Sequence, residues 1–316
     1  MISIIIPVYN EEENIDLLNK KIFSTLKNES FEIIFVNDGS NDNSLSKMKN
    51  LSYKYNNVIL INLKKNFGQT AAIQAGFDHA HGNIIIPMDC DLQNDPSDIP
   101  KLLKKINEGY DVVSGWRKQR KDNDVLRVIP SKIANYIISK ISGVKLHDYG
   151  CTLKAYKKEF IEDIRLYGEM HRFIPIYANW EGAKVAEIIV NHHKRHAGKS
   201  KYGISRVPKV ILDMMVLKFF DSLISRPIHL FGKLGLVLIV LGFFTASFAL
   251  WLKVIKDVSF ILTPLPILVI FFLLSGLFCI LLGIIAEIQS RIYYQTKTNK
   301  SYLIKNIISK KKKIVK

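Results

Sequence analysis

The sequence predicts an α/β domain with a mainly parallel sheet, followed by an amphipathic segment and a two-helix transmembrane hairpin. Three observations support this prediction. Strand-like and helix-like segments alternate in the first half, Asp89 and Asp91 follow a buried apolar strand, and two long uncharged stretches lie near the C-terminal end. The alternation predicts right-handed βαβ units with helices on both faces of the sheet. The aspartates predict a ligand site at its carboxyl edge.

The first half supplies the elements of this sheet. Runs of β-branched and apolar residues predict strands at 3–8, 32–37, 58–63, 83–88 and 111–114. Helical spacing of apolar residues predicts helices at 11–26, 43–55, 69–80 and 96–108. No Gly-x-Gly-x-x-Gly and no Walker lysine motif follows the first strand, so the common dinucleotide and P-loop interpretations lose their main support.

The second half begins with polar and basic segments. A basic loop at 116–128 precedes a predicted helix at 130–141 and a loop that contains Asp148. A returning strand is predicted at 185–191 and is followed by a basic loop at 192–202. Apolar residues then recur on one helical face between 207 and 224, which predicts an amphipathic helix in a membrane interface.

Two stretches without charge, 234–252 and 258–286, each exceed the roughly 18 apolar residues that indicate a membrane span. The alternative is a helical pair buried in a soluble core. Much of the net charge of +17 flanks these stretches, with Arg226 and Lys233 before them and four lysines at 310–313 after them. The positive-inside rule then places both flanks in the cytoplasm and the short turn outside, with the protein in the bacterial inner membrane.

The sequence thus divides into a catalytic domain at 1–205, a juxtamembrane region at 206–232, two spans at 233–290 and a basic cytoplasmic tail at 291–316. The terminal lysine run is read either as a solvated tail or as a contact for anionic lipid. Three scattered cysteines have no metal-ligand or disulfide spacing, which agrees with a reducing cytosol. The basic residues lack the interleaved aromatic residues of a stacking platform, so no nucleic-acid partner is expected.

The chemistry is predicted from Asp89 and Asp91. Two carboxylates at positions i and i+2 of a strand point to the same side, so they can hold one divalent ion between them. This pattern predicts a metal-dependent transfer from a nucleotide diphosphate. Basic loops place Arg117, Arg195 and Lys201 where phosphate needs cations. The alternatives are ordinary turn chemistry for the polar strand ends and a solvated or lipid-facing surface for the basic residues.

Five motifs together resemble family 2 glycosyltransferases, in particular their polyprenyl-phosphate branch, which contains the dolichyl-phosphate mannosyltransferases and the bactoprenol glucosyltransferases. The motifs, in chain order, are Pro7-Val8-Tyr9-Asn10-Glu11, Val36-Asn37-Asp38-Gly39-Ser40, Asn66-Phe67-Gly68-Gln69, Asp89-Cys90-Asp91-Leu92-Gln93 and Arg195-His196-Ala197-Gly198-Lys199-Ser200-Lys201-Tyr202. The resemblance extends from Ile2 to about Tyr202, and the two spans match the membrane-anchored bacterial type. Cys90 departs from the small residue, such as alanine, that is frequent in this branch.

The resemblance implies a GT-A fold and an inverting transfer of a sugar, from a UDP-hexose or a similar nucleotide sugar, to an undecaprenyl-type phosphate at the cytoplasmic membrane face. It implies the following roles. The nucleotide contacts Pro7, Tyr9, Glu11, Asp38, Asn66 and Asp89; Mg²⁺ or Mn²⁺ contacts Asp89, Asp91 and Gln93; the acceptor phosphate contacts Arg117, Arg127, Ser131, Arg195 and Lys201. Asp91, Arg117, Arg195 and Lys201 are also expected to act in catalysis, with Asp148 as a base or an orienting carboxylate.

Two alternatives remain at this point. A processive polysaccharide synthase shares the fold and the Asp-x-Asp pattern, but it usually carries a Gln-x-x-Arg-Trp motif and more spans. A non-enzymatic basic membrane scaffold explains the charge but not the ordered polar strand ends. Two spans leave much of the hairpin surface free to pair, so a homo-oligomer is compatible with the sequence.

Overall fold

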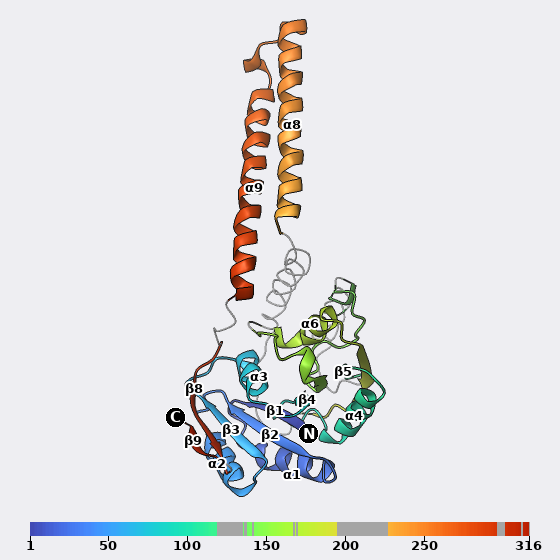
Figure 1. Cartoon of the computed structure of the whole chain (residues 1–316), viewed down its shortest axis with the longest axis vertical. Helices are drawn as coiled ribbons and strands as arrows, with labels where there is room; N and C mark the ends of the chain where they lie inside the picture. Colours follow the sequence, from blue (N-terminus) through green and yellow to red (C-terminus); the bar gives the residue numbers. More distant parts are fainter. Residues whose placement is uncertain are drawn as a thin grey trace. The chain divides into compact units, whose positions relative to one another are not determined.

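The computed structural model describes residues 1–118, 135, 138–140, 142–166, 168, 170–194, 227–295, 301–310 and 312–315. The chain divides into two compact units, Met1–Met214 with Lys300–Lys316, and Met215–Asn299. The first unit contains the α/β domain and the second contains two long apolar helices (Figure 1). The predicted helix at 207–224 and most of the one at 130–141 fall outside the described residues.

One sheet forms the centre of the first unit. Its described strands lie in the order β7-β5-β6-β4-β1-β2-β3-β8-β9. Their bounds are β1 Ile2–Val8, β2 Phe31–Asn37, β3 Val58–Leu63, β4 Ile84–Pro87, β5 Val112–Trp116, β6 Lys154–Lys157, β7 Val185–Ile189, β8 Ile304–Ser309 and β9 Lys312–Val315. β1 pairs in parallel with β2 and β4, and β2 pairs in parallel with β3. The parallel centre of the sheet agrees with the prediction, whereas the inserted β6 is antiparallel to both β4 and β5.

Helices cover both faces of the sheet. They are α1 Ile15–Thr25, α2 Ser44–Lys54, α3 Gln69–Asp78, α4 Ile99–Asn107 and α6 Ile174–Trp180, with short turns η1 Pro96–Asp98, η2 Lys158–Phe160 and η3 Met170–Arg172. Successive strand residues point to opposite faces. Ile4 and Ile6 therefore join a core with α1, α2 and α4, whereas Ile5 joins a second core with α3 and α6. The predicted two-sided α/β architecture is confirmed.

The C-terminal segment corrects one part of the predicted organisation. The sequence predicts a basic tail at 291–316, but β8 pairs antiparallel with β3, and β9 pairs with β8. Ile308 is buried, and Tyr302, just before β8, is 2% exposed. Ile308 joins the core on one face of the sheet, whereas Ile304 and Ile307 pack against the core on the other face. Lys312 and Lys313 of the lysine run therefore lie in β9, a strand of the domain.

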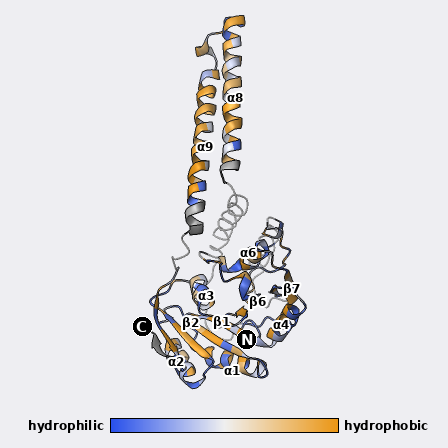
Figure 2. Ribbon diagram, in the orientation of Figure 1, coloured by the Kyte–Doolittle hydropathy of each residue, from blue (hydrophilic) through white to orange (hydrophobic). Residues whose placement is uncertain are grey.

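The second unit is a hairpin of α8 Pro227–Lys256 and α9 Leu265–Gln295, joined through η4 Phe260–Leu262. Leu230–Lys256 and Leu265–Gln289 are long and apolar enough to cross a membrane, with mean hydropathies of 2.3 and 3.0. Of the residues in their most apolar windows, 17% and 11% are buried. In Figure 2, most of the length of both helices is coloured as hydrophobic. These helices therefore lack the burial expected of a helical pair in a soluble core.

Two features set the geometry of the hairpin. The second helix begins at Leu265, later than the predicted 258, because Pro264 and Pro266 fit only before or within the first turn of a helix. The helices approach closely at two glycines. A Cβ added at Gly235 would lie 2.7 Å from the carbonyl oxygen of Gly276, and the reciprocal distance is 2.8 Å. Small residues at such a crossing allow helices to pack without a hydrophobic driving force.

Candidate active site

The predicted site residues meet at the carboxyl edge of the parallel strands. Tyr9 follows β1, Asp38 follows β2, Asn66 lies beyond β3, and Asp89 lies beyond β4. Because these four strands are parallel neighbours, their ends lie at one edge of the sheet. This is the edge where open α/β sheets bind ligands.

Asp89 is held by two neutral donors. Gln69 Nε2 donates to Asp89 Oδ1 over 2.7 Å, and Thr152 Oγ1 donates to Asp89 Oδ2 over 2.6 Å. Gln69 begins α3, and Thr152 lies just before β6. These bonds orient the carboxylate and leave its negative charge unneutralised, which suits a group that binds a cation.

Asp91 lies in a turn, which corrects the predicted geometry of the aspartate pair. β4 ends at Pro87, so neither carboxylate is part of the strand, and strand alternation does not set their directions. Leu92 instead has φ of 61°, and Asp91 Oδ1 accepts from the backbone N–H of Gln93 over 3.1 Å. Asp91 is 6% exposed. A tight turn, rather than a pleat, shapes this loop.

The donor set of this loop fits a magnesium-type ion. Among the described residues, no group of three or more His, Cys, Asp or Glu side chains forms a complete metal cage. A metal bound to a diphosphate needs only one or two protein carboxylates, since phosphate and water oxygens complete its shell. Asp89 and Asp91 are the carboxylates that could supply these ligands, and the amide oxygen of Gln93 is of the same hard type.

Asp38 shapes the loop after β3. Its carboxylate accepts from the backbone N–H of Phe67 over 2.7 Å and of Gly68 over 2.9 Å. Burial raises the pKa of Asp38, and these two hydrogen bonds partly oppose that rise. Gly39 has φ of 71°, and a Cβ there would lie 2.6 Å from the backbone nitrogen of Asn66. Only glycine allows these two loops to approach so closely.

The loop after β1 is tied to the loop after β2. The backbone N–H of Asn10 donates to Ser40 Oγ over 3.1 Å, and that of Asn41 donates to Asn10 Oδ1 over 2.8 Å. Glu11 Oε2 accepts from Asn14 Nδ2 at the start of α1. Tyr9 and Pro7 are half-buried, and Asn66 is exposed. The predicted nucleotide residues thus line neighbouring, mutually braced loops.

Arg117 and Asp148 form a bidentate ion pair. Arg117 Nε donates to Asp148 Oδ2 over 2.6 Å, and Nη2 donates to Oδ1 over 3.0 Å. Their side chains are 15% and 6% exposed. The backbone N–H of Gly150 also donates to Asp148 Oδ1 over 3.0 Å. A carboxylate held in this way orients a guanidinium, so the pair favours the orienting role for Asp148 over that of a base.

Two further cations lie beside this pair and were missed from the sequence. A Cβ added at Gly150 would lie 3.1 Å from Arg117 Nη2 and 3.5 Å from Arg172 Nη1. Lys154, 2% exposed, donates to the carbonyl oxygen of Tyr149 over 3.0 Å. Burial lowers the pKa of Lys154 to about 8, and the charges of Arg172 and Arg117 also lower it. Positive charge is therefore concentrated around the segment 148–154, which also carries Thr152, the hydroxyl donor to Asp89.

Arg127, Ser131, Arg195 and Lys201 lie outside the described residues. Thr152 gave no sequence signal, because it lies 63 residues from Asp89. Gln69 is part of the Asn66-Phe67-Gly68-Gln69 motif. Its position in the first turn of α3 was the only feature of the sequence that pointed to its contact with Asp89.

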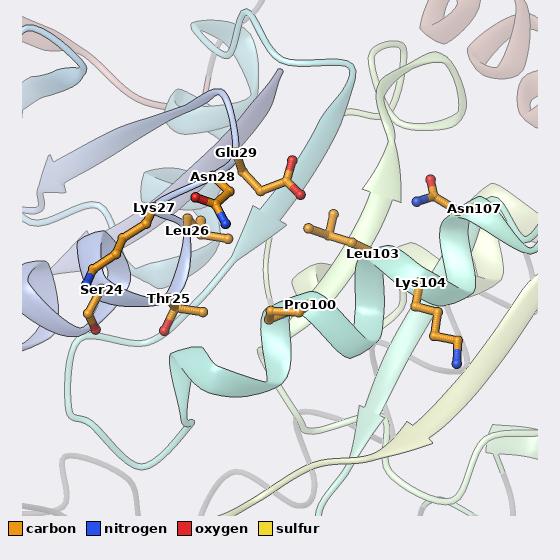
Figure 3. Close-up of a pocket in the computed structure, with 10 residues that line it drawn as sticks. All are labelled: Ser24, Thr25, Leu26, Lys27, Asn28, Glu29, Pro100, Leu103, Lys104 and Asn107. Carbon is orange, nitrogen blue, oxygen red and sulfur yellow. The ribbon is translucent and has the colours of Figure 1, made fainter.

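A surface cavity lies elsewhere in the domain. Figure 3 shows it between the end of α1 and α4, with Leu26, Glu29, Pro100 and Leu103 among its lining residues. The segment after α1 leads into β2, and α4 leads towards β5, so this cavity is associated with the amino edge of the sheet. None of its lining residues belongs to the carboxyl-edge cluster described above.

Comparisons with known proteins match this arrangement. Residues 3–165 match the model of glycosyl transferase family 2. The chain is 40% identical to the dodecaprenyl-phosphate galacturonate synthase of Rhizobium johnstonii, over 97% of this chain and 92% of that protein. It is 35% identical to the undecaprenyl-phosphate 4-deoxy-4-formamido-L-arabinose transferase of Proteus mirabilis, over 98% of this chain and 95% of that protein.

Solved structures share the fold. Glucosyl-3-phosphoglycerate synthase from Mycobacterium tuberculosis, in complex with Mn²⁺, UDP and phosphoglyceric acid, superposes with a TM-score of 0.54 at 14% identity. The match covers 69% of this chain and 78% of that one, and it indicates a common GT-A-like architecture. With a family match over more than half of its length and relatives that align along almost all of it, the chain belongs to glycosyl transferase family 2.

Proposed function

We propose that this glycosyltransferase moves a sugar from a nucleotide diphosphate sugar to the phosphate of a polyprenyl lipid at the cytoplasmic face of a bacterial inner membrane. The observation that carries the proposal is that the carboxyl edge of the sheet has both a carboxylate with neutral donors and a cluster of basic side chains. Asp89 is oriented by neutral donors, one of them Thr152, and the segment that carries Thr152 also carries Lys154, which clusters with Arg117 and Arg172. The named relatives act on polyprenyl phosphates, which supports the same acceptor class here.

The donor half of the site has an electrostatic task. Negative charge builds on the departing diphosphate as the bond to the sugar breaks. A divalent ion bound by Asp89 and Asp91, Mg²⁺ or Mn²⁺, supplies Lewis-acid stabilisation of that charge. The protein's part is preorganisation, because Gln69 and Thr152 fix the Asp89 carboxylate before the substrate arrives. Loops after β1 and β2 carry Tyr9 and Asp38 towards the nucleotide.

The acceptor half requires cations more than a base. A phosphate acceptor is already anionic at neutral pH, so little proton abstraction is needed before it attacks the sugar. Arg117 presents a planar guanidinium that matches phosphate oxygens, and Asp148 fixes its orientation. We assign Arg127, Ser131, Arg195 and Lys201 to the same acceptor task on the basis of the family resemblance.

The hairpin supports attachment to a bilayer. β8 pairs with β3, so the segment after α9 belongs to the same domain as the segment before α8. A chain that leaves this domain through α8 and returns through α9 crosses a bilayer an even number of times. Basic residues on both flanks then favour the cytoplasm for the domain. The apolar surface of the hairpin is also available for pairing in a homo-oligomer.

The test of function is sugar transfer by the purified full chain in detergent. Radiolabelled nucleotide sugars, including galacturonate and formamido-arabinose donors, are supplied with undecaprenyl phosphate, with and without EDTA. We expect organic-extractable label that EDTA removes, and a loss of several orders of magnitude in Asp91→Asn. Asp16→Asn, a half-exposed aspartate on α1, is the matched control and should retain turnover. Label in polymer would instead indicate a polysaccharide synthase, and no label with any donor would indicate a scaffold.

Orientation has its own test. We expect a membrane-impermeant thiol reagent to label Ser259→Cys, in the turn of the hairpin, in intact cells. The exposed Lys310→Cys, after β8, should react only after lysis. Labelling of both positions in intact cells would contradict the cytoplasmic placement of the domain.

A further inference from the structure

Three asparagine side chains connect β8 with the loop that follows β2. Asn62 Nδ2 donates to Asn306 Oδ1 over 3.0 Å, and Asn37 Nδ2 donates to Asn62 Oδ1 over 2.8 Å. The residues lie on three adjacent strands, β8, β3 and β2. Asn62 is 5% exposed and Asn37 is 2% exposed, so these amides depend on each other rather than on bulk water.

The register of the sheet creates this chain of amides. Asn306 lies directly opposite Asn62, and Asn62 lies directly opposite Asn37. Directly paired residues present their side chains on the same face of a sheet, close enough to bond. Asn37 is the last residue of β2, so the chain of amides reaches the carboxyl edge.

The inner end of this chain reaches two loops of the donor site. Asn37 Oδ1 accepts from the backbone N–H of Ser40 over 3.2 Å. Ser40 Oγ in turn accepts from the backbone N–H of Asn10. The loop between Asn37 and Ser40 carries Asp38, and the loop before Asn10 carries Tyr9. A hydrogen-bonded path therefore runs from the C-terminal strand to both loops.

We infer that β8 is a functional part of the donor site, in which Asn306 is a positioning residue that holds the 37–40 loop through Asn62 and Asn37. The inference rests on the proposed function for what that loop binds. Both polar atoms of the Asn62 side-chain amide, Oδ1 and Nδ2, are hydrogen-bonded, and the residue is buried. Loss of the Asn306 oxygen leaves Asn62 Nδ2 without this acceptor, and an amide that reorients to find another releases Asn37.

The bland alternative is that β8 only covers the edge of β3. Tyr302 provides a matched control for that role, because it anchors the same segment at a different place. Tyr302 Oη donates to Asp78 Oδ2 over 2.6 Å. Asp78 is the last residue of α3, whereas Gln69, which contacts Asp89, is the first. The hydrogen bond of Tyr302 therefore ties its segment to the end of α3.

The experiment compares Asn306→Leu, Asn306→Asp and Tyr302→Phe in the full chain. We expect Asn306→Leu to raise KM for the nucleotide sugar on the order of three- to tenfold, the effect of one net hydrogen bond. Its kcat and its KM for the lipid acceptor should change by less than about twofold. Asn306→Asp should stay close to wild type, because its carboxylate oxygen still accepts from Asn62. Tyr302→Phe should lower Tm without raising the donor KM.

A second readout needs no activity. Amide hydrogen exchange at Ser40 should accelerate in Asn306→Leu and not in Tyr302→Phe. Equal rises of donor KM in both variants, or unchanged exchange at Ser40, would overturn the inference. If wild type transfers no sugar from any donor while exchange at Ser40 still separates the two variants, the proposed function fails and the positioning role of Asn306 stands.

Discussion

Asp111 at the amino edge of the sheet and Asp89 at its carboxyl edge are held in different ways. At the amino edge, Asp111 accepts from Lys157 Nζ over 2.7 Å and from the backbone N–H of Lys184 over 2.9 Å. At the carboxyl edge, Asp89 accepts from an amide and a hydroxyl. An ammonium neutralises the charge of its partner, whereas neutral donors fix a carboxylate and preserve its charge for a cation. The neutral donors of Asp89 thus fit the metal-binding role proposed for it, whereas the ammonium partner of Asp111 fits a structural role.

The titration of the two edges follows the same division. Although burial opposes it, the hydrogen bond from Lys157 lowers the pKa of Asp111, and that bond raises the pKa of Lys157. At the carboxyl edge, burial raises the pKa of Asp38 and lowers that of Lys154 to about 8. The fold therefore stabilises the charged forms of Asp111 and Lys157 at the amino edge. At the carboxyl edge, the charged forms of Asp38 and Lys154 lower the stability of the fold. Such a cost is typical of functional sites.

The largest expected effect separates Asp89 from Asp111. Asp89→Asn should lower sugar transfer by orders of magnitude, because it removes a charge that binds the metal, and should change Tm little. Asp111→Asn should leave kcat/KM near wild type and cost about 1–3 kcal/mol of unfolding free energy, since Lys157 and the Lys184 N–H lose a charged acceptor. Transfer rates and thermal unfolding of both variants give the answer. A stability loss without an activity loss in Asp89→Asn would reverse the comparison.

The next effect concerns Lys154. Its pKa of about 8 in the folded protein lies below the ordinary 10.5, so the unfolded chain binds the proton more tightly between these values. The cost is full below about pH 8 and disappears as pH rises towards 10.5. The shift corresponds to about 3 kcal/mol. Urea unfolding of the wild type should therefore show stability rising from pH 8 to 10 relative to Lys154→Met. If the free energy of unfolding depends on pH in the same way in both proteins, the charged form of Lys154 does not destabilise the fold.

The smallest effect tests how Asp89 is oriented. Thr152→Val removes one hydroxyl of similar volume, so Asp89 keeps its charge and loses one of two donors. One hydrogen bond to a charged group contributes about 1.5–3 kcal/mol, so turnover should fall by about ten- to a hundredfold. A higher metal concentration should restore part of it. Thr25→Val, at the end of α1, is the matched control. Wild-type turnover in Thr152→Val would mean that Gln69 alone orients Asp89.

The sequence was sufficient for the elements whose signals are local. Apolar runs and helical spacing predicted β1 to β4 and the helices between them, and the parallel order followed from their alternation. Asp89 and Asp91 were correctly placed at the carboxyl edge, although in a turn. The contacts that give this site its character are long-range. Thr152 reaches Asp89 across 63 residues, and Asn62 reaches Asn306 across 244.

Lys154 illustrates why such features escape sequence reasoning. It lies in a segment with Lys157 and Lys158, where three lysines predict an exposed surface. The antiparallel position of β6 between β4 and β5 buries Lys154 and leaves Lys157 at the opposite end of the strand. Tertiary packing, not local propensity, therefore decides which of these lysines is buried.

The pairing of β8 with β3 has a consequence for biosynthesis. At roughly 5–20 residues per second, a ribosome needs about 12 to 50 seconds to extend the chain by the 244 residues that separate Asn62 from Asn306. During this interval β3 is an open edge, and both apolar helices are made before β8. The sheet is therefore completed only after the hairpin has been synthesised and is ready for the membrane. Such an order would delay the final shape of the nucleotide loops until the enzyme has reached the bilayer that holds its lipid substrate.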